Sequence, residues 1–301
     1  MMAPDAPFEI PFWGANTIMV AIGCAVFGAL AGSVGTFVLA RRQSLLADVA
    51  GHAALPGVAL AFLFGEWFGL SGRSPWLLLL GGGISALLAA WSTPWLASKR
   101  RLGADGANAV ALAGFFGLGS VLFSVVQSHP SGAQGGLRRL LFGNAAAMTS
   151  SDAIALGVIA IVALTTLMLA FKELSLLAFD EAAASVLGLR TRVLEWVLLL
   201  LLVATVVAGM QVAGVALVVS MLIAPAAAAR VLGGSFARTA TTAACIGIAC
   251  ALVGAIASRA VTHVPTGSAM TLAATATFFL SIPAARVLRN SRARVLTERA
   301  S

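Results

Sequence analysis

Long apolar runs bounded by charged residues constrain the fold of this chain more than any other feature. Nine runs lie near the length of about 20 residues that a helix needs to cross the hydrocarbon core of a bilayer. They cover residues 16–40, 46–64, 75–97, 107–127, 152–171, 193–210, 212–230, 238–258 and 267–288. Only Gln211 separates the sixth from the seventh, which Pro225 interrupts, so a total of eight stays open. The runs predict an all-α polytopic membrane protein.

The composition leaves no room for a separate soluble domain. Charged residues make up 10% of the chain, against about a quarter in soluble domains. We therefore expect one integral-membrane domain over residues 1–301, with a tail at 1–15, a transmembrane bundle at 16–288 and a basic tail at 289–301. The first fourteen residues, MMAPDAPFEIPFWG, contain no Lys or Arg, so they do not resemble a secretory signal peptide and we expect them to be retained.

Lys and Arg are distributed unequally between the two sides of the predicted bundle. If the loops alternate and the N-terminus lies outside, fifteen of these residues face the cytoplasm. The four that fall outside are Arg73, Arg138, Arg139 and Arg259. This positive-inside bias places the C-terminus in the cytoplasm and supports an odd number of spans. The net charge of +8 thus reflects topology, and nucleic acid is not expected as a partner.

Asp48 and His52 stand inside the second apolar run. A carboxylate in the middle of a membrane helix costs roughly 2.5–3.5 kcal/mol on insertion scales, so it normally faces a bundle interior or a water-filled path. Positions i and i+4 lie on one helix face, one turn apart, and a carboxylate and an imidazole placed there can bind one metal ion. Two simpler interpretations stay open: the two side chains only pair with each other, or Asp48 caps a helix that begins near Val49.

Pro56 follows one turn after this pair. We expect Pro56 and Gly57 to break the helix just beyond the pair, so that freed carbonyl oxygens can point into a transport path. The alternative is a kink that serves packing alone.

Two loops are longer than a turn. In the loop that we place outside, Leu137 to Phe142 predict a short interfacial helix. The other loop, residues 172–192, reads KELSLLAFDEAAASVLGLRTR; Asp180 and Glu181 begin a predicted short helix and Gly188 ends it. Such a helix at the cytoplasmic surface is a docking element, unless the segment is an ordinary solvated connector. Glu195, in the sixth span, is expected to pair with Arg192 or Lys172.

Five segments in this order resemble the signatures of ATP-binding-cassette (ABC) permeases for manganese, zinc and ferrous iron. They are GTFVLARRQSLLADVAGHAALPGVALAF, LRRLLFGNAAAMTSSD, FDEAAASVLGLRTR, VAGVALVVSMLIAPAAAARVL and VPTGSAMTLAATATFFLS. The resemblance extends from Gly35 to Ser281 and implies a fold similar to that of vitamin B12 permeases. It also implies a multi-pass location in the bacterial cytoplasmic membrane.

The resemblance implies roles for the residues that match the family's motifs. Asp48 and His52 match the family's metal-coordinating Asp and His. Asp180 lies in the predicted coupling helix at about residues 180–190, and Glu181, Ala182 and Gly188 resemble the Glu-Ala-Ala…Gly pattern that contacts the ATPase. The implied partners are a cytoplasmic ATP-binding subunit, an extracytoplasmic metal-binding protein, membrane lipid and a second permease, identical or a paralogue.

The chain itself is not expected to be an enzyme. Its two lysines, Lys99 and Lys172, do not follow a Gly-rich loop, so there is no phosphate-binding loop and the ATPase must be a separate subunit. We expect no permanently bound cofactor, only a transported divalent metal: manganese first, with zinc or iron open. The alternative functions are an ABC permease for an iron chelate or a vitamin, and a secondary metal transporter that works without ATP.

Overall fold

The computed structural model describes residues 15–69, 74–100, 103–128, 143, 145, 148–260 and 264–300, with side chains from 17 to 287 except 99 and 100. These ranges are helical, with short connections and no strand among them. The helices are α1 (Ala15–Ala40), α2 (Ser44–Trp67), α3 (Pro75–Arg100), α4 (Ala104–Ser128), α6 (Ser150–Leu169), α7 (Phe171–Phe179), α8 (Glu181–Val186), α9 (Thr191–Val212), α10 (Val215–Leu232), α11 (Phe236–Ala260) and α12 (Thr266–Ala300).

Nine of these helices are long and apolar enough to cross a membrane, counting only the described residues. Each overlaps one of the nine predicted runs, so the prediction of nine spans is confirmed and the count of eight is wrong. The separation of α9 from α10 depends on Gly214, whose φ of 86° is accessible to glycine at little cost. Pro225 lies within α10 and does not divide it.

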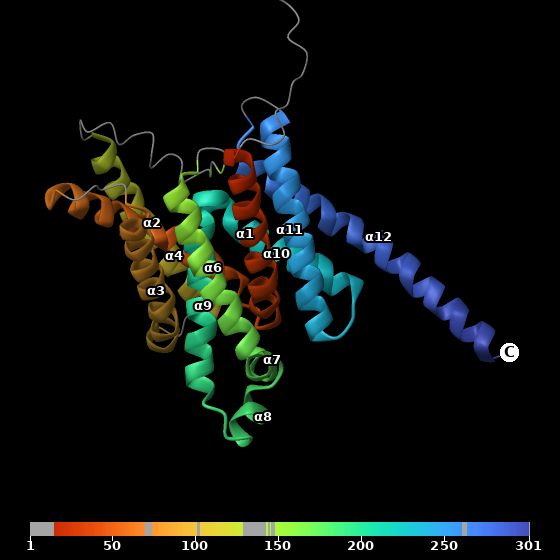
Figure 1. Ribbon diagram of the computed structural model, residues 1–301. Helices are drawn as coiled ribbons and strands as arrows, with labels where there is room; N and C mark the ends of the chain where they lie inside the picture. Colours follow the sequence, from red (N-terminus) through yellow and green to blue (C-terminus); the bar gives the residue numbers. More distant parts are fainter. Residues whose placement is uncertain are drawn as a thin grey trace, which may run out of the picture.

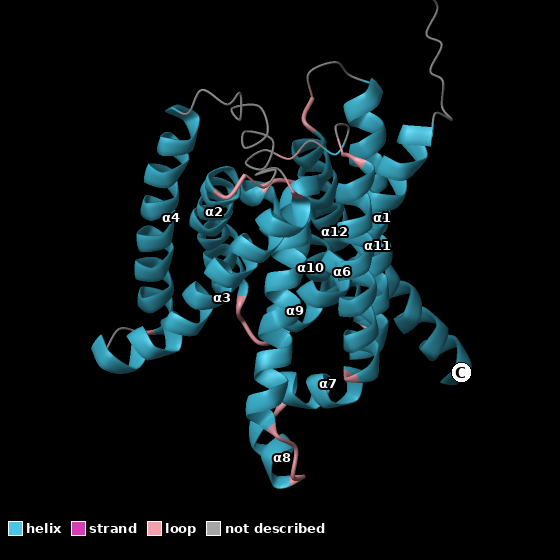
Figure 2. Cartoon of the chain, turned by 60° about the vertical axis from the view of Figure 1, so that its left-hand side comes forward, coloured by secondary structure: helices cyan, strands magenta, loops and turns pink. Residues whose placement is uncertain are grey.

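The membrane helices form two outer groups and a third group of helices that lies between them (Figure 1). Helices α2, α3 and α4 pack against one another on one side, and α10, α11 and α12 do so on the other. Between the two groups lie α1, α6 and α9, and α9 contacts members of both groups. Figure 2 shows the same bundle from another direction, with α7 and α8 at one end of it. We call this end the α8 end.

Glycines allow α1 to pack closely against α11. A Cβ atom at Gly28 would collide with the backbone carbonyl of Gly247, and one at Gly32 would collide with that of Ala243. Small residues at such crossings bring helix backbones together and favour packing within a membrane. The main apolar core forms beside this contact, around Phe27, Leu202 and Met221.

Helix α12 continues from Thr266 to Ala300, through most of the segment 289–301 that we predicted as a basic tail. The predicted interfacial helix at Leu137–Phe142 lies outside the described residues.

Candidate functional site

Asp48 and His52 lie side by side on α2. The Nε2 atom of His52 is 3.5 Å from Oδ1 of Asp48, and both side chains are only partly buried, at 25% and 39% exposure. The helix begins at Ser44, four residues before Asp48, so the interpretation of Asp48 as an N-cap is wrong. The Nδ1 atom of His52 is buried and has no hydrogen-bond partner among the described residues. The pair therefore presents one carboxylate and one imidazole from adjacent turns.

The other faces of α2 are packed against apolar side chains. Val49 and Ala53 are fully buried, in a cluster with Ala89 of α3 and Ala111 of α4. Such packing fixes the rotation of α2 about its axis, because turning the helix would break these close van der Waals contacts. The orientation of Asp48 and His52 is thus set by residues that have no metal chemistry of their own.

Helix α4 borders the pair on one side. The ring of Phe116 meets the imidazole of His52 edge to face, with centroids 5.2 Å apart. One turn further along both helices, a Cβ atom at Gly119 would lie 2.9 Å from Cδ of Pro56, which is too close for a side chain. Gly119 therefore allows α4 to lie directly against the proline-containing turn of α2.

Pro56 lies inside α2, which continues to Trp67, so the predicted break of the helix at Pro56 and Gly57 is wrong. A proline has no backbone N–H, so the carbonyl of the residue four positions earlier loses its helical donor. That residue is His52. His52 therefore carries both the imidazole and a backbone carbonyl that lacks its usual helical donor.

The geometry of the pair suits two ligands of one metal ion. Two ligand atoms of one ion, with metal bonds of about 2.0–2.2 Å, lie roughly 3.4 Å apart in a tetrahedral site and roughly 3.1 Å apart in an octahedral one. The separation of 3.5 Å is near this range and equally fits a direct pair between Asp48 and His52, so it does not decide the coordination number. Within the part of the chain that the structure describes, no group of three or more His, Cys, Asp or Glu side chains could hold a metal ion. A complete site needs further ligands from water, backbone or another subunit.

The second predicted set of functional residues lies at the α8 end. Asp180 caps α8: its Oδ1 accepts a hydrogen bond of 2.8 Å from the backbone N–H of Ala183. Gly188 follows the helix with a φ of 78°, as expected of a glycine that ends a helix. Glu181 and Ala182 are exposed on the first turn. The short helix predicted after Asp180 is therefore confirmed.

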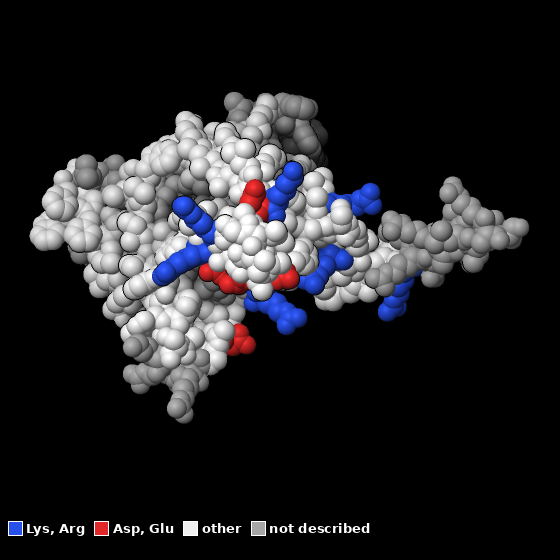
Figure 3. Space-filling view, turned by 90° about the horizontal axis from the view of Figure 1, so that it is seen from below, with Lys and Arg blue, Asp and Glu red and all other residues white. Residues whose placement is uncertain are grey.

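Charged side chains gather around this projecting helix. Viewed from the α8 end, Lys and Arg alternate with Asp and Glu around the centre of the molecule (Figure 3). The apolar side chains of Val186 and Leu187, at the end of α8, are 86% and 70% exposed. An exposed apolar tip surrounded by charge is typical of a surface that contacts another protein.

The position of Glu195 in the sequence predicted a pair with Arg192 or Lys172, and this prediction is wrong. Its carboxylate lies 3.0 Å from Nη2 of Arg41, at the end of α1. Sequence reasoning missed Arg41 because its partners are more than a hundred residues away in the chain. No local pattern could have identified it.

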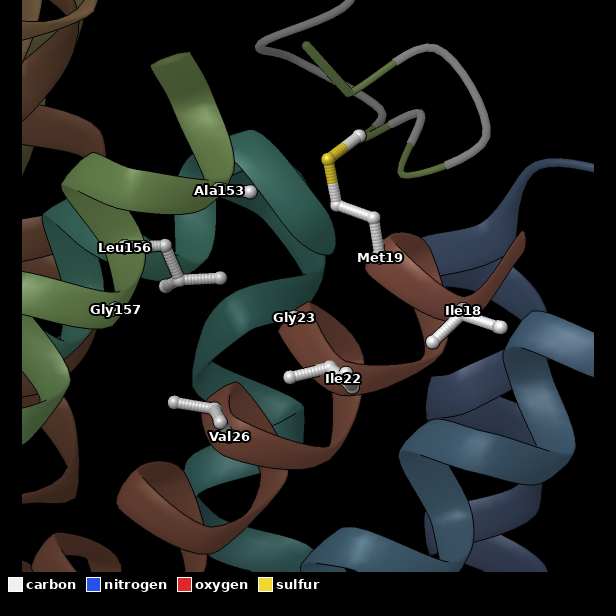
Figure 4. A pocket seen from close by; sticks show the side chains of 8 residues that line it. All are labelled: Ile18, Met19, Ile22, Gly23, Val26, Ala153, Leu156 and Gly157. Atoms are coloured by element: carbon white, nitrogen blue, oxygen red, sulfur yellow. The ribbon is translucent and has the colours of Figure 1, made fainter. Parts of the chain in front are cut away.

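A cavity between α1 and α6 is unsuited to metal ions. It has a volume of about 320 Å³ and is lined by apolar side chains that include Ile22, Val26 and Leu156. Figure 4 shows these side chains projecting from the two helices without any carboxylate or imidazole among them. Its lining fits hydrocarbon and offers no ligand for a metal ion.

Comparisons with known proteins extend over almost the whole chain. Residues 15–285 match the ABC 3 transport family. The zinc transport system membrane protein TroC of Treponema pallidum is 34% identical over 264 residues, which cover 87% of this chain and 87% of TroC. The manganese transport system membrane protein MntC of Bacillus subtilis is 35% identical, over 94% of this chain and 66% of MntC.

Solved structures share the fold. PsaBC from Streptococcus pneumoniae, determined in complex with a Fab, aligns with a TM-score of 0.79 at 28% identity and covers 92% of this chain and 96% of that one. A metal-chelate type ABC transporter in an inward-facing conformation aligns with a TM-score of 0.64 at 20% identity, covering 89% of this chain and 84% of that one. The second similarity concerns the fold alone.

Proposed function

This chain belongs to the ABC 3 transport family, and we propose that it forms the membrane path of a divalent-metal importer in which Asp48 and His52 bind the ion in transit. It is a permease subunit of an ABC metal-ion transport system in the bacterial inner membrane. The observation that carries the proposal is the separation of 3.5 Å between the Asp48 carboxylate and the His52 imidazole, which suits two ligands of one metal ion.

A second permease copy would complete the ligand set. Two copies related by a two-fold axis contribute identical groups, so Asp48 and His52 of each would supply two carboxylates and two imidazoles. Two carboxylates neutralise a divalent cation, and neutral imidazoles add coordination without charge.

We propose manganese as the physiological ion. Similar permeases are named for manganese in Bacillus and Listeria, for zinc in Treponema and for iron in Haemophilus. Four nitrogen and oxygen ligands alone suit tetrahedral Zn²⁺, whereas added water or carbonyl oxygens give the six-coordinate geometry that Mn²⁺ favours. The relatives that are named for manganese support this choice.

The partners follow from the topology that we propose. The chain forms one permease domain, with its N-terminus outside and its C-terminus in the cytoplasm, so α8 lies at the cytoplasmic face. A separate ATP-binding subunit contacts α8 through Glu181, Ala182 and the residues around them. An extracytoplasmic binding protein delivers the metal at the opposite end, and the chain has no ATPase activity of its own.

The test is uptake of Mn²⁺, Fe²⁺ and Zn²⁺ by proteoliposomes that contain the permease, its ATPase and its binding protein. We expect Asp48→Asn and His52→Ala each to reduce uptake about 100-fold or more, because both remove a direct ligand. Asp105→Asn is the matched control, since Asp105 lies in the first turn of α4 and makes the same change of charge.

The outcomes separate the candidate functions. Uptake at the wild-type rate in both variants, with normal assembly of the complex, would show that Asp48 and His52 are structural. Uptake of an iron chelate or a vitamin by the Asp48→Asn variant would identify a permease for larger cargo. Metal uptake that persists without the ATPase, and stops when the proton gradient is dissipated, would identify a secondary transporter.

A further inference from the structure

Arg41 makes three contacts at the α8 end of the bundle. Its Nη2 atom lies 3.3 Å from Oε2 of Glu181 and 3.0 Å from Oε1 of Glu195, and its Nη1 atom donates a hydrogen bond of 3.2 Å to the backbone carbonyl of Leu177. The Arg41 side chain is only 13% exposed, although both carboxylates are substantially exposed. One largely buried guanidinium thus joins three segments.

Each contact belongs to a different helix. Leu177 lies in the last turn of α7, where backbone carbonyls lack intrahelical partners, so Arg41 acts as a C-terminal cap for that helix. Glu181 is the first residue of α8, and Glu195 lies in the early part of α9. Arginine is suited to this position because its planar guanidinium carries five donors in a fixed geometry and remains charged.

The backbone connects Arg41 directly to α2. Only Arg41, Arg42 and Gln43 separate α1 from α2. The amide of Gln43 bonds to the carbonyl of Val38, and that of Arg42 bonds to the carbonyl of Leu39, so the turn is a closed Schellman motif. Arg42 adopts a φ of 56° in this motif, a left-handed conformation that is unusual for arginine. A turn closed in this way leaves little freedom between the Arg41 side chain and the start of α2.

Removing the guanidinium would change the local charge balance. The carboxylates of Glu181 and Glu195 both contact Nη2 of Arg41, so the two carboxylates lie close to each other. Without Arg41 they would repel each other, and α8 would lose its ionic connection to both α1 and α9. Of these contacts, the one with Glu181 connects directly to the proposed ATPase-binding helix.

We propose that Arg41 is a positioning residue that transmits movement of α8 to α2, the helix that carries Asp48 and His52. This inference rests on the proposed function, because it assumes that α8 contacts the ATPase and that α2 binds the metal. A displacement of α8 moves Glu181, which moves Arg41 and the closed turn, and the turn moves the first residues of α2. Arg41 touches neither the metal nor ATP.

The test compares metal uptake with ATP hydrolysis in the same proteoliposomes of the complete transporter. We expect Arg41→Gln to retain ATP hydrolysis within about twofold of wild type and to lower the number of metal ions moved per ATP at least tenfold. Arg41→Lys should give an intermediate metal-to-ATP ratio, because an ammonium group keeps the positive charge but lacks the planar set of donors that contacts three partners at once. Arg192→Gln is the matched control, since Arg192 is exposed at the same end with no ion pair among the described residues.

A second variant tests the same link if the Arg41→Gln protein does not fold. Glu195→Gln leaves the proposed ATPase-binding residues unchanged and removes one of the two carboxylates that hold Arg41 in place, so it should lower the metal-to-ATP ratio in the same direction by a smaller factor. The proposal is overturned if Arg41→Gln keeps the wild-type ratio. It is equally overturned if uptake and ATP hydrolysis fall in proportion in both variants, because that result indicates a purely structural role.

Hydrogen exchange separates failure of this inference from failure of the proposed function. In nanodiscs, without any transported metal, Arg41→Gln should accelerate amide exchange at least fivefold both in α8 and in the first turn of α2, and Arg192→Gln should change neither. If wild type moves no divalent metal, the proposed function fails, and the exchange experiment still tests the link. Acceleration in α8 with an unchanged α2 would overturn the inference.

Discussion

Helices α2 and α8 carry the two sets of candidate functional residues, and they are held in place by different means. In α2, 72% of the residues in the most apolar window are buried, Gly57 lies against the backbone of Gly81 in α3, and Gly119 of α4 lies against Pro56. In α8 only Ala184 of its six residues is buried, and contacts at its ends hold it: the Asp180 cap, Gly188 and the ion pair of Glu181. Close packing suits a helix that orients ligands, whereas polar end contacts can rearrange when a partner binds.

The largest expected effect breaks the packing of α2. A Cβ atom at Gly57 would lie 2.6 Å from Cβ of Ser85 and 2.7 Å from the carbonyl carbon of Gly81, both in α3. We expect Gly57→Ala to destabilise the permease by about 1–3 kcal/mol, because the obstructing atoms are mostly backbone. Thermal unfolding in detergent, followed by the loss of monodisperse protein, measures this.

Gly83→Ala is the matched control for this substitution. Gly83 also lies in a membrane helix, but nothing lies within 4 Å of a Cβ atom placed there. Alanine should therefore be neutral or stabilise the helix by up to about 1 kcal/mol. Equal unfolding midpoints for the two variants would contradict the view that α2 depends on close backbone packing.

The next effect concerns the end of α8. Gly188 has a φ of 78°, where a residue with a Cβ atom is strained by about 1–2 kcal/mol. We expect Gly188→Ala to leave the unfolding midpoint unchanged and to weaken binding of the ATPase subunit about 5- to 30-fold. Gly188→Asn should bind more tightly than Gly188→Ala, since asparagine adopts this conformation more readily; the reverse order would exclude backbone strain as the cause.

A smaller effect is expected at the start of α8. Asp180→Ala removes the N-cap, which costs about 1 kcal/mol, and should weaken binding of the ATPase about fivefold. Asp180→Ser keeps a capping oxygen and loses the negative charge. Binding by the serine variant at the wild-type level supports capping, whereas binding as weak as that of alanine means that the carboxylate contacts the ATPase itself.

The smallest effect tests the turn between α1 and α2. Arg42 has a φ of 56°, so Arg42→Gly should relieve strain and stabilise the permease by at most about 1 kcal/mol. Arg42→Ala should leave stability near that of wild type, because alanine has a similar preference against this conformation. If both variants unfold at the same temperature, the turn stores no strain at this position.

The features that the sequence predicted are those set by short segments of the chain and by the conformational preferences of single residues. The nine spans follow from the lengths of apolar runs, because backbone polar groups in lipid must be satisfied within a helix. The helical repeat alone places Asp48 and His52 on one face. The cap at Asp180 and the left-handed Gly188 follow from the conformational preferences of single residues.

The tertiary structure decided which distant segments meet. Glu195 pairs with Arg41, 154 residues away, and not with Arg192 three positions before it. Gly28 and Gly32 are recognisable as packing residues, but their partner helix α11 is known only from the fold. Helix period and hydropathy describe a segment by itself, whereas these contacts depend on how all the helices pack together. For this reason the candidate metal-binding pair could be proposed from sequence, and the arginine that we propose to link it to α8 could not.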